Sequence, residues 1–252
     1  MRYTCQALDA LWLSATPVQC TSENPIQTGR TTRGVERIGD TIRRPTGPRS
    51  VFVHTLLRYL EARAFSGAPK WLGIDSSGRE ILSYMPGDVP PELKAFSTAQ
   101  VTEAAHLLRA LHDSTMDFEG RGSHQVVCHG DASPCNCVFR DGLPYAFIDF
   151  DAAHAGERRD DVGYAAWLWL DLGNEDLDPA EQGRRVGEFV AAYGGMDLAD
   201  AIPAVVDAQT ELSRRDGAPL STKEWARHCL QWSNENREPL GAGLALVRHA
   251  AL

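Results

Sequence analysis

The sequence contains no apolar run long enough to cross a membrane. Its longest candidate, YAAWLWLDL at residues 164–172, falls far short of the ~20 residues that a spanning helix needs. Residues 1–20 carry one arginine and a short, interrupted apolar stretch, which makes a weak secretory signal. We therefore expect a cytoplasmic protein with no membrane partner.

Basic residues are also scarce. The chain has 25 Lys and Arg residues against 34 Asp and Glu residues, so its formal net charge is −9. Such a surface repels phosphates, and no segregated basic stripe offsets the repulsion. We expect no nucleic-acid partner, whereas a cationic small molecule would be attracted.

The six cysteines do not follow the spacing of a known metal site. Cys128, His129, Cys135 and Cys137 crowd into one segment, yet neither CxxC…CxxC nor CxxC…HxxxH is present. A chain of 252 residues with 43% hydrophobic content builds a core without disulfide staples. We expect free thiols that pack as small hydrophobic side chains, with a zinc site as the alternative.

The first part of the chain predicts a small sheet with one helix. Residues 1–28 show no clear hydrophobic period, so we expect an N-terminal arm of uncertain structure. Short strands at 34–38 and 41–44 flank a Gly-Asp turn, and a helix is expected at 50–65. A second hairpin around SSGR follows, and the Pro- and Gly-rich PGDVPP then ends an N-terminal lobe that we place at 29–86.

Helical periodicity dominates the rest of the chain, residues 87–252. A helix is expected at 97–113 with Ser97 as its N-cap. Two strands, 137–140 and 145–149, flank the turn DGLP. Four later segments have helical spacing: DVGYAAWLWLDL, PAEQGRRVGEFVAAYGG, ADAIPAVVDAQTELSRRD and TKEWARHCLQWSNENREPLGAGLALVRHAAL.

The DGLP hairpin brings polar side chains together. If its strands pair about a turn centred between Gly142 and Leu143, Asn136 lies opposite Asp149, and Asp131 precedes the first strand by a short turn. Carboxylate and amide oxygens in this arrangement suit Mg²⁺. A carboxylate not bound to the ion can accept a proton from a hydroxyl, so the hairpin predicts a phosphoryl-transfer site.

The same residues carry a family pattern. HGDASPCN, 129–136, has the HxDxxxxN spacing of the kinase catalytic loop, and IDFD, 148–151, stands where kinases carry Asp-Phe-Gly. From about Gly29 to Trp169 the chain resembles the aminoglycoside phosphotransferase and choline kinase-like family. The resemblance implies a bilobal, protein-kinase-like α+β fold, with an N-terminal nucleotide-binding lobe and a larger, mostly helical catalytic and substrate-binding lobe. It also implies an ATP- and Mg²⁺-dependent small-molecule kinase.

Carried onto this sequence, the family pattern makes Asp131 the catalytic base and Asn136 and Asp149 the metal ligands. The alternative for Asp131 and Asn136 is a purely structural turn residue. We expect His129 to bond the backbone around the loop rather than to shuttle protons. Asp161 matches the family's second aspartate, and two roles stay open for it: N-cap of a helix, and support of the catalytic loop.

The nucleotide grip departs from the kinase pattern. No lysine precedes Lys70, so the strand residue that would bind phosphates is an arginine in TIRRP, and we favour Arg44 over Arg43. A surface arginine is the alternative. An acidic partner on the following helix is not evident, since His54 and Glu61 are the only polar candidates nearby.

The segment LSYMPG at 82–87 resembles the kinase hinge. This resemblance implies that the backbone of Ser83 and Met85 bonds the adenine of ATP. Such contacts leave little signature in side chains, so GTP stays open as an alternative nucleotide.

The sequence says least about the molecule that accepts the phosphate. Acidic side chains and the aromatic faces of Trp225 and Trp232 offer a pocket for an aminoglycoside, choline or another cationic amine. Solvated helix faces and core aromatics are the more ordinary interpretation of the same residues. Sugars, homoserine and other drugs also stay open. A catalytically quiet relative that binds nucleotide or metabolite without turnover is the alternative function, and the missing lysine motivates it.

Overall fold

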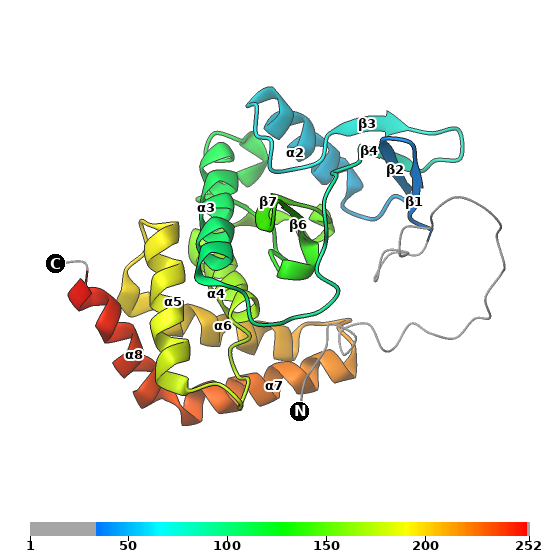
Figure 1. Ribbon diagram of the computed structural model, residues 1–252. Coiled ribbons are helices and arrows are strands. Elements are labelled where there is room, and N and C mark those ends of the chain that lie inside the picture. Colours follow the sequence, from blue (N-terminus) through cyan, green and yellow to red (C-terminus); the bar gives the residue numbers. More distant parts are fainter. Residues whose placement is uncertain (1–33, 251–252) are drawn as a thin grey trace.

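The computed structural model describes residues 34–250, with side chains described as far as residue 247. It shows a small N-terminal lobe, blue and cyan in Figure 1, followed by a larger lobe of helices. The predicted arm at residues 1–28 lies outside the described residues. The two-part α+β architecture predicted from the sequence is confirmed, whereas the boundary after residue 86 stays a prediction.

A four-stranded antiparallel sheet forms the N-terminal lobe. Its strands are hydrogen-bonded in the order β1 (Glu36–Ile38), β2 (Thr41–Arg44), β4 (Glu80–Ser83) and β3 (Trp71–Ile74). The two predicted hairpins are therefore joined through β2 and β4. This pairing sets Arg44 opposite Glu80, a contact between strands that are not neighbours in the sequence.

The N-terminal lobe contains one helix, and another helix begins the C-terminal lobe. α2 (Ser50–Ala62) buries an apolar face that includes Val53 and Leu57. α3 (Thr98–Ser114) opens the C-terminal lobe with a capping box, in which Gln100 N donates to Ser97 Oγ at 3.3 Å. The predicted N-cap at Ser97 is confirmed, and it satisfies N–H groups that have no partner inside the helix.

The DGLP hairpin forms, but with a different register from the predicted one. β6 (Cys137–Arg140) pairs with β7 (Leu143–Phe147), and a bulge interrupts the ladder. Beyond the strands, Ile148 N donates to Asn136 O at 2.8 Å. Asn136 thus lies opposite Ile148, and the prediction that it faces Asp149 across the ladder is wrong by one residue.

A second small sheet was not predicted. β5 (Val126–Cys128) pairs with β8 (His154–Gly156), and the two strands flank the polar segments on either side. Each strand has three residues, which is too short for an alternating pattern to stand out from a loop. The sheet fixes where the catalytic-loop segment begins and where the IDFD segment ends.

Five helices complete the C-terminal lobe. They are α4 (Arg158–Trp169), α5 (Pro179–Tyr193), α6 (Ala201–Arg214), α7 (Leu220–Glu235) and α8 (Arg237–Ala250). α5 begins at the proline of the predicted segment PAEQGRRVGEFVAAYGG and ends just before its two glycines, whereas the last predicted helix breaks into two at Asn236. Within residues 34–250, none of these helices is long and apolar enough to span a bilayer.

The prediction of free thiols is confirmed for three cysteines and wrong for Cys135, which is disulfide-bonded. Cys128, Cys137 and Cys229 are free and buried. Burial raises the pKa of Cys229 to about 12 and raises the pKa of the other two thiols as well. These three side chains therefore stay protonated and pack as small hydrophobic groups. Cys5 and Cys20 lie outside the described residues.

The contact between α5 and α8 generates a stability prediction. A Cβ on Gly183 would lie 2.1 Å from the carbonyl oxygen of Leu240, whereas a Cβ on Gly241 would meet nothing within 4 Å. Gly183→Ala should lower the free energy of unfolding by about 2 kcal/mol, because the helices are forced apart. Gly241→Ala, the matched control, should raise it by about 0.5 kcal/mol through helix propensity. Urea unfolding measures both, and equal shifts would contradict the packing described.

Candidate active site

Asp131 lies in the loop between β5 and β6, and two side chains bind its carboxylate. Tyr164 Oη donates to Oδ1 at 3.0 Å, and Asn136 Nδ2 donates to Oδ2 at 2.8 Å. Burial raises the pKa of the Asp131 carboxyl, while the electrostatic influence of His129 and the Tyr164 hydrogen bond oppose that rise. A raised pKa makes a carboxylate a better proton acceptor, which suits a general base.

Asn136 is oriented by its amide nitrogen. Nδ2 donates to the backbone oxygen of Asp131 at 3.1 Å as well as to its carboxylate at 2.8 Å. With the nitrogen committed, Oδ1 of the same amide is the atom that remains for a cation. The ladder bond from Ile148 also places Asn136 beside the residue that precedes Asp149.

Asp149 leaves the hairpin in a left-handed conformation, with φ 62° and ψ 64°. Residues other than glycine adopt this conformation at a cost, and it is frequent at functional sites. Asp149 is near enough to Asp131 for their charges to interact. The predicted neighbourhood of Asp131, Asn136 and Asp149 therefore exists despite the different register, and its hard oxygen donors fit Mg²⁺.

Arg44 reaches this site from the N-terminal lobe. Its guanidinium donates from Nη1 to Asp149 Oδ1 at 2.8 Å and from Nη2 to Asp151 Oδ1 at 2.5 Å. Burial alone would lower the pKa of Arg44, but the charges of Asp151, Asp149 and Glu80 together raise it. The side chain is 7% exposed and stays charged, so the surface-arginine alternative is wrong.

The acidic partner of Arg44 is Glu80, which the sequence analysis missed. Arg44 Nε donates to Glu80 Oε1 at 2.6 Å, and His54 Nε2 lies 2.6 Å from Oε2 of the same carboxylate. Glu80 stands on β4 rather than on the helix where kinases carry this residue. Of the two candidates on α2, His54 therefore joins the site, whereas Glu61 pairs with Lys70 at the surface.

The carboxylate of Asp161 binds the backbone of the catalytic loop. The carboxylate accepts from His129 N at 2.6 Å and from Gly130 N at 2.9 Å. Burial acts to raise the pKa of Asp161, but the hydrogen bond and charge of His112 outweigh it, so the pKa is lowered. α4 begins at Arg158, so Asp161 lies inside the helix. The N-cap alternative is wrong, and support of the loop is what the structure shows.

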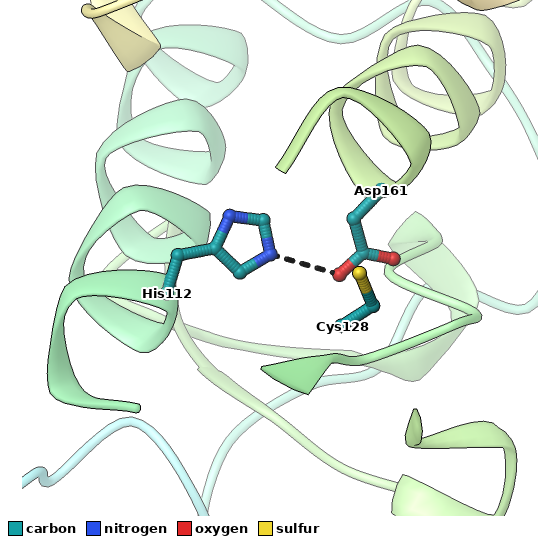
Figure 2. A group of neighbouring side chains, drawn as sticks. All are labelled: His112, Cys128 and Asp161. Atoms are coloured by element: carbon teal, nitrogen blue, oxygen red, sulfur yellow. Dashed lines mark hydrogen bonds and ion pairs between the residues drawn. The ribbon is translucent and has the colours of Figure 1, made fainter. Parts of the chain in front are cut away.

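Figure 2 shows His112 from α3, Asp161 from α4 and Cys128 from β5 gathered in the core. His112 Nε2 lies 3.1 Å from Asp161 Oδ2, and its Nδ1 lies 2.8 Å from Tyr193 Oη. Both ring nitrogens and both carboxylate oxygens thus have hydrogen-bond partners. This buried network braces the catalytic loop, and both ring nitrogens of His112 are already engaged in it.

His129 is buried and bonds the backbone, as predicted. Its Nδ1 accepts from Asp131 N at 3.3 Å, so Nε2 is the nitrogen that donates to Ile148 O at 3.1 Å. The ring also packs on Phe150, with centroids 4.5 Å apart. The residue therefore ties the catalytic loop to the segment that carries Asp149.

The predicted hinge contacts differ in their availability. Ser83 N donates to Lys70 O at 2.9 Å inside the sheet, so this N–H is already committed. Met85 lies beyond the end of β4. Its backbone remains the better candidate of the two for an adenine contact.

The two tryptophans considered for acceptor binding are core residues. Trp225 and Trp232 are 7% and 8% exposed, and Trp225 stacks on Trp167 with ring centroids 4.6 Å apart. Among the acidic candidates, Asp207 pairs with Arg159 at 2.7 Å. The ordinary interpretation of the tryptophans is confirmed, so they do not provide the aromatic faces of a cation pocket.

Comparison with known proteins agrees with this geometry. Residues 79–202 match the model of the phosphotransferase enzyme family, APH. The trifolitoxin immunity protein of Rhizobium leguminosarum bv. trifolii is 31% identical over 258 residues, spanning 86% of this chain and 96% of that protein. An ethanolamine kinase of Plasmodium vivax shares the fold, with a TM-score of 0.53 at 14% identity over 79% of this chain and 77% of that one.

The matched residues 79–202 include the catalytic loop and the IDFD segment. The family resemblance seen in these motifs is thus confirmed. The chain belongs to the phosphotransferase enzyme family, and its fold is that of the small-molecule kinases.

Proposed function

We propose that this protein is an ATP- and Mg²⁺-dependent phosphotransferase that moves the γ-phosphate to a hydroxyl of a small molecule. The observation that carries the proposal is the placement of Asp131, Asn136 and Asp149 together, with Arg44 facing them from the other lobe. These are the parts that phosphoryl transfer requires: a base, metal ligands and a phosphate-binding cation.

Asp131 accepts the proton of the acceptor hydroxyl. As this oxygen forms its bond to the γ-phosphorus, the bond from phosphorus to the bridging β-phosphate oxygen breaks, and ADP leaves with the electron pair. Asn136 Oδ1 and the Asp149 carboxylate would hold Mg²⁺, which when bound neutralises charge on the phosphates. Tyr164 and Asn136 keep the base in place.

Arg44 takes the place of the kinase lysine. Glu80 anchors its Nε, so the two terminal nitrogens face the Asp149 and Asp151 side and can turn to the α- and β-phosphates. The missing lysine motivated the alternative of a quiet, nucleotide-binding protein. A buried, charged arginine at the same place weakens that motive, and we favour catalysis. Met85 would contribute a backbone contact to the adenine, or to guanine if GTP is used.

A hydroxyl-bearing antibiotic or toxin is the acceptor class that we put first, with aminoglycosides as its cationic members. Support comes from the relative at 31% identity, which is named as an immunity protein against a toxin. Addition of a doubly charged phosphate to such a compound would alter its binding to a target. We place the reaction in the cytoplasm, where ATP is available.

Substitutions of the proposed base and of the proposed metal ligand should differ in their effects on turnover and on nucleotide binding. Asp131→Asn should lower kcat by about 10³-fold, because proton transfer is lost, while the affinity for Mg-ATP is preserved. Asp149→Ala should weaken Mg-ATP binding as well. ADP release measures turnover over a panel of hydroxyl acceptors, and calorimetry measures binding. Asp117→Asn, at a side chain that is 77% exposed, is the control. Full activity of Asp131→Asn would show that Asp131 is not the base.

A second prediction concerns the arginine. Arg44→Lys should weaken Mg-ATP binding roughly tenfold, because a single amine cannot stay on Glu80 and also reach the phosphates; this is about 1.4 kcal/mol. Glu80→Gln should act in the same direction. Arg43→Lys changes the neighbouring residue, which pairs with Asp75 at 3.9 Å, and is the matched control. Equal affinities of the Arg43 and Arg44 variants in calorimetry would remove Arg44 from the nucleotide site.

A further inference from the structure

Helix α4 grips the catalytic loop at successive residues. Asp161 accepts from the backbone of His129 and Gly130 at 2.6 and 2.9 Å. Further along the same helix, Trp169 Nε1 donates to Ala132 O at 2.9 Å. These contacts fix the path of the loop on both sides of Asp131, but they leave the side chain of Asp131 itself unconstrained.

The contact from α4 to that side chain comes from Tyr164. It follows Asp161 by three positions, so both side chains lie on one face of the helix. Tyr164 Oη donates to Asp131 Oδ1 at 3.0 Å. Burial and the charge of Asp131 raise the pKa of the Tyr164 phenol well above its ordinary value, so the phenol keeps its proton and remains the donor.

We propose that Tyr164 is a positioning residue that fixes the carboxylate plane of Asp131 for proton acceptance. This inference rests on the proposed role of Asp131 as the base. A carboxylate rotates easily about its last side-chain bond. Asn136 holds Oδ2 at 2.8 Å and Tyr164 holds Oδ1 at 3.0 Å, so donors on two different oxygens together stop the rotation. Each oxygen keeps a further lone pair, which can receive the acceptor's proton.

Tyr164→Phe isolates the hydroxyl. The ring of Tyr164 packs against Trp167 with centroids 6.1 Å apart, and phenylalanine retains this packing. The matched control is Tyr59→Phe. Tyr59 lies on helix α2, and its hydroxyl accepts from Nε of Arg63, the C-cap of that helix, at 3.1 Å.

The experiment has a kinetic and a stability arm, both on the full chain. Hydrolysis of Mg-ATP, in which water replaces the unidentified acceptor, measures kcat and the KM for ATP. Tyr164→Phe should lower kcat on the order of tenfold, because a misplaced base loses reactivity, and should leave KM within about twofold. Urea unfolding of Tyr164→Phe, Asp131→Ala and the double variant should give non-additive shifts, whereas Tyr59→Phe with Asp131→Ala should give additive ones.

The outcomes separate this inference from the proposed function. Additive shifts for Tyr164 and Asp131 would overturn the contact, and coupling with an unchanged kcat would overturn the positioning role. A wild-type protein that neither binds nor hydrolyses Mg-ATP would overturn the proposed function, and with it the positioning role that rests on it. In that case the unfolding cycle would still show whether the two side chains are bonded.

Discussion

The buried guanidinium of Arg44 is the contact that joins the N-terminal sheet to the proposed metal-binding segment of the other lobe. It extends from the sheet of the N-terminal lobe to Asp149 and Asp151 of the other lobe, while Glu80 holds its inner end. A buried charge without partners costs several kcal/mol, so this position requires the surrounding carboxylates. His54 lies against the far side of Glu80 and thereby links α2 to the same network. The side chain of Arg44 thus connects the segment that carries Asp149 to the sheet.

The catalytic loop is held in a different way, by neutral and charged contacts from helix α4 and by the ring of His129. Asp161 and Trp169 bind its backbone, and His129 ties it to the carbonyl of Ile148. His112 in turn braces Asp161 from α3. Because these groups are buried and paired, the loop geometry is built into the core of the C-terminal lobe rather than left to the surface. A rigid loop of this kind would hold the proposed base in position without reorganisation.

Sequence reasoning found the parts of the site that follow a local pattern. The spacing from His129 to Asn136 and the hairpin that ends near Asp149 were enough to bring together the proposed base and the two proposed metal ligands. The register failed by one residue at Asn136, because the hairpin turns tightly with Arg140 opposite Leu143, and the bulge between Val138 and Phe139 recovers only part of the offset. Glu80 was missed for a non-local reason: its strand pairs with β2 across a gap of a helix and a third strand. Tyr164 was missed because a tyrosine in an apolar helical stretch has the pattern of a core residue.

The most direct test of the kinase assignment is the melting temperature of the wild-type protein with Mg-ATP, with ATP in EDTA, and without ligand. A ligand that binds the native state raises the melting temperature by mass action. Nucleotide held jointly by Arg44 and a metal at Asn136 and Asp149 should give a clear rise with Mg-ATP and a smaller one in EDTA. No rise at millimolar Mg-ATP would contradict the account.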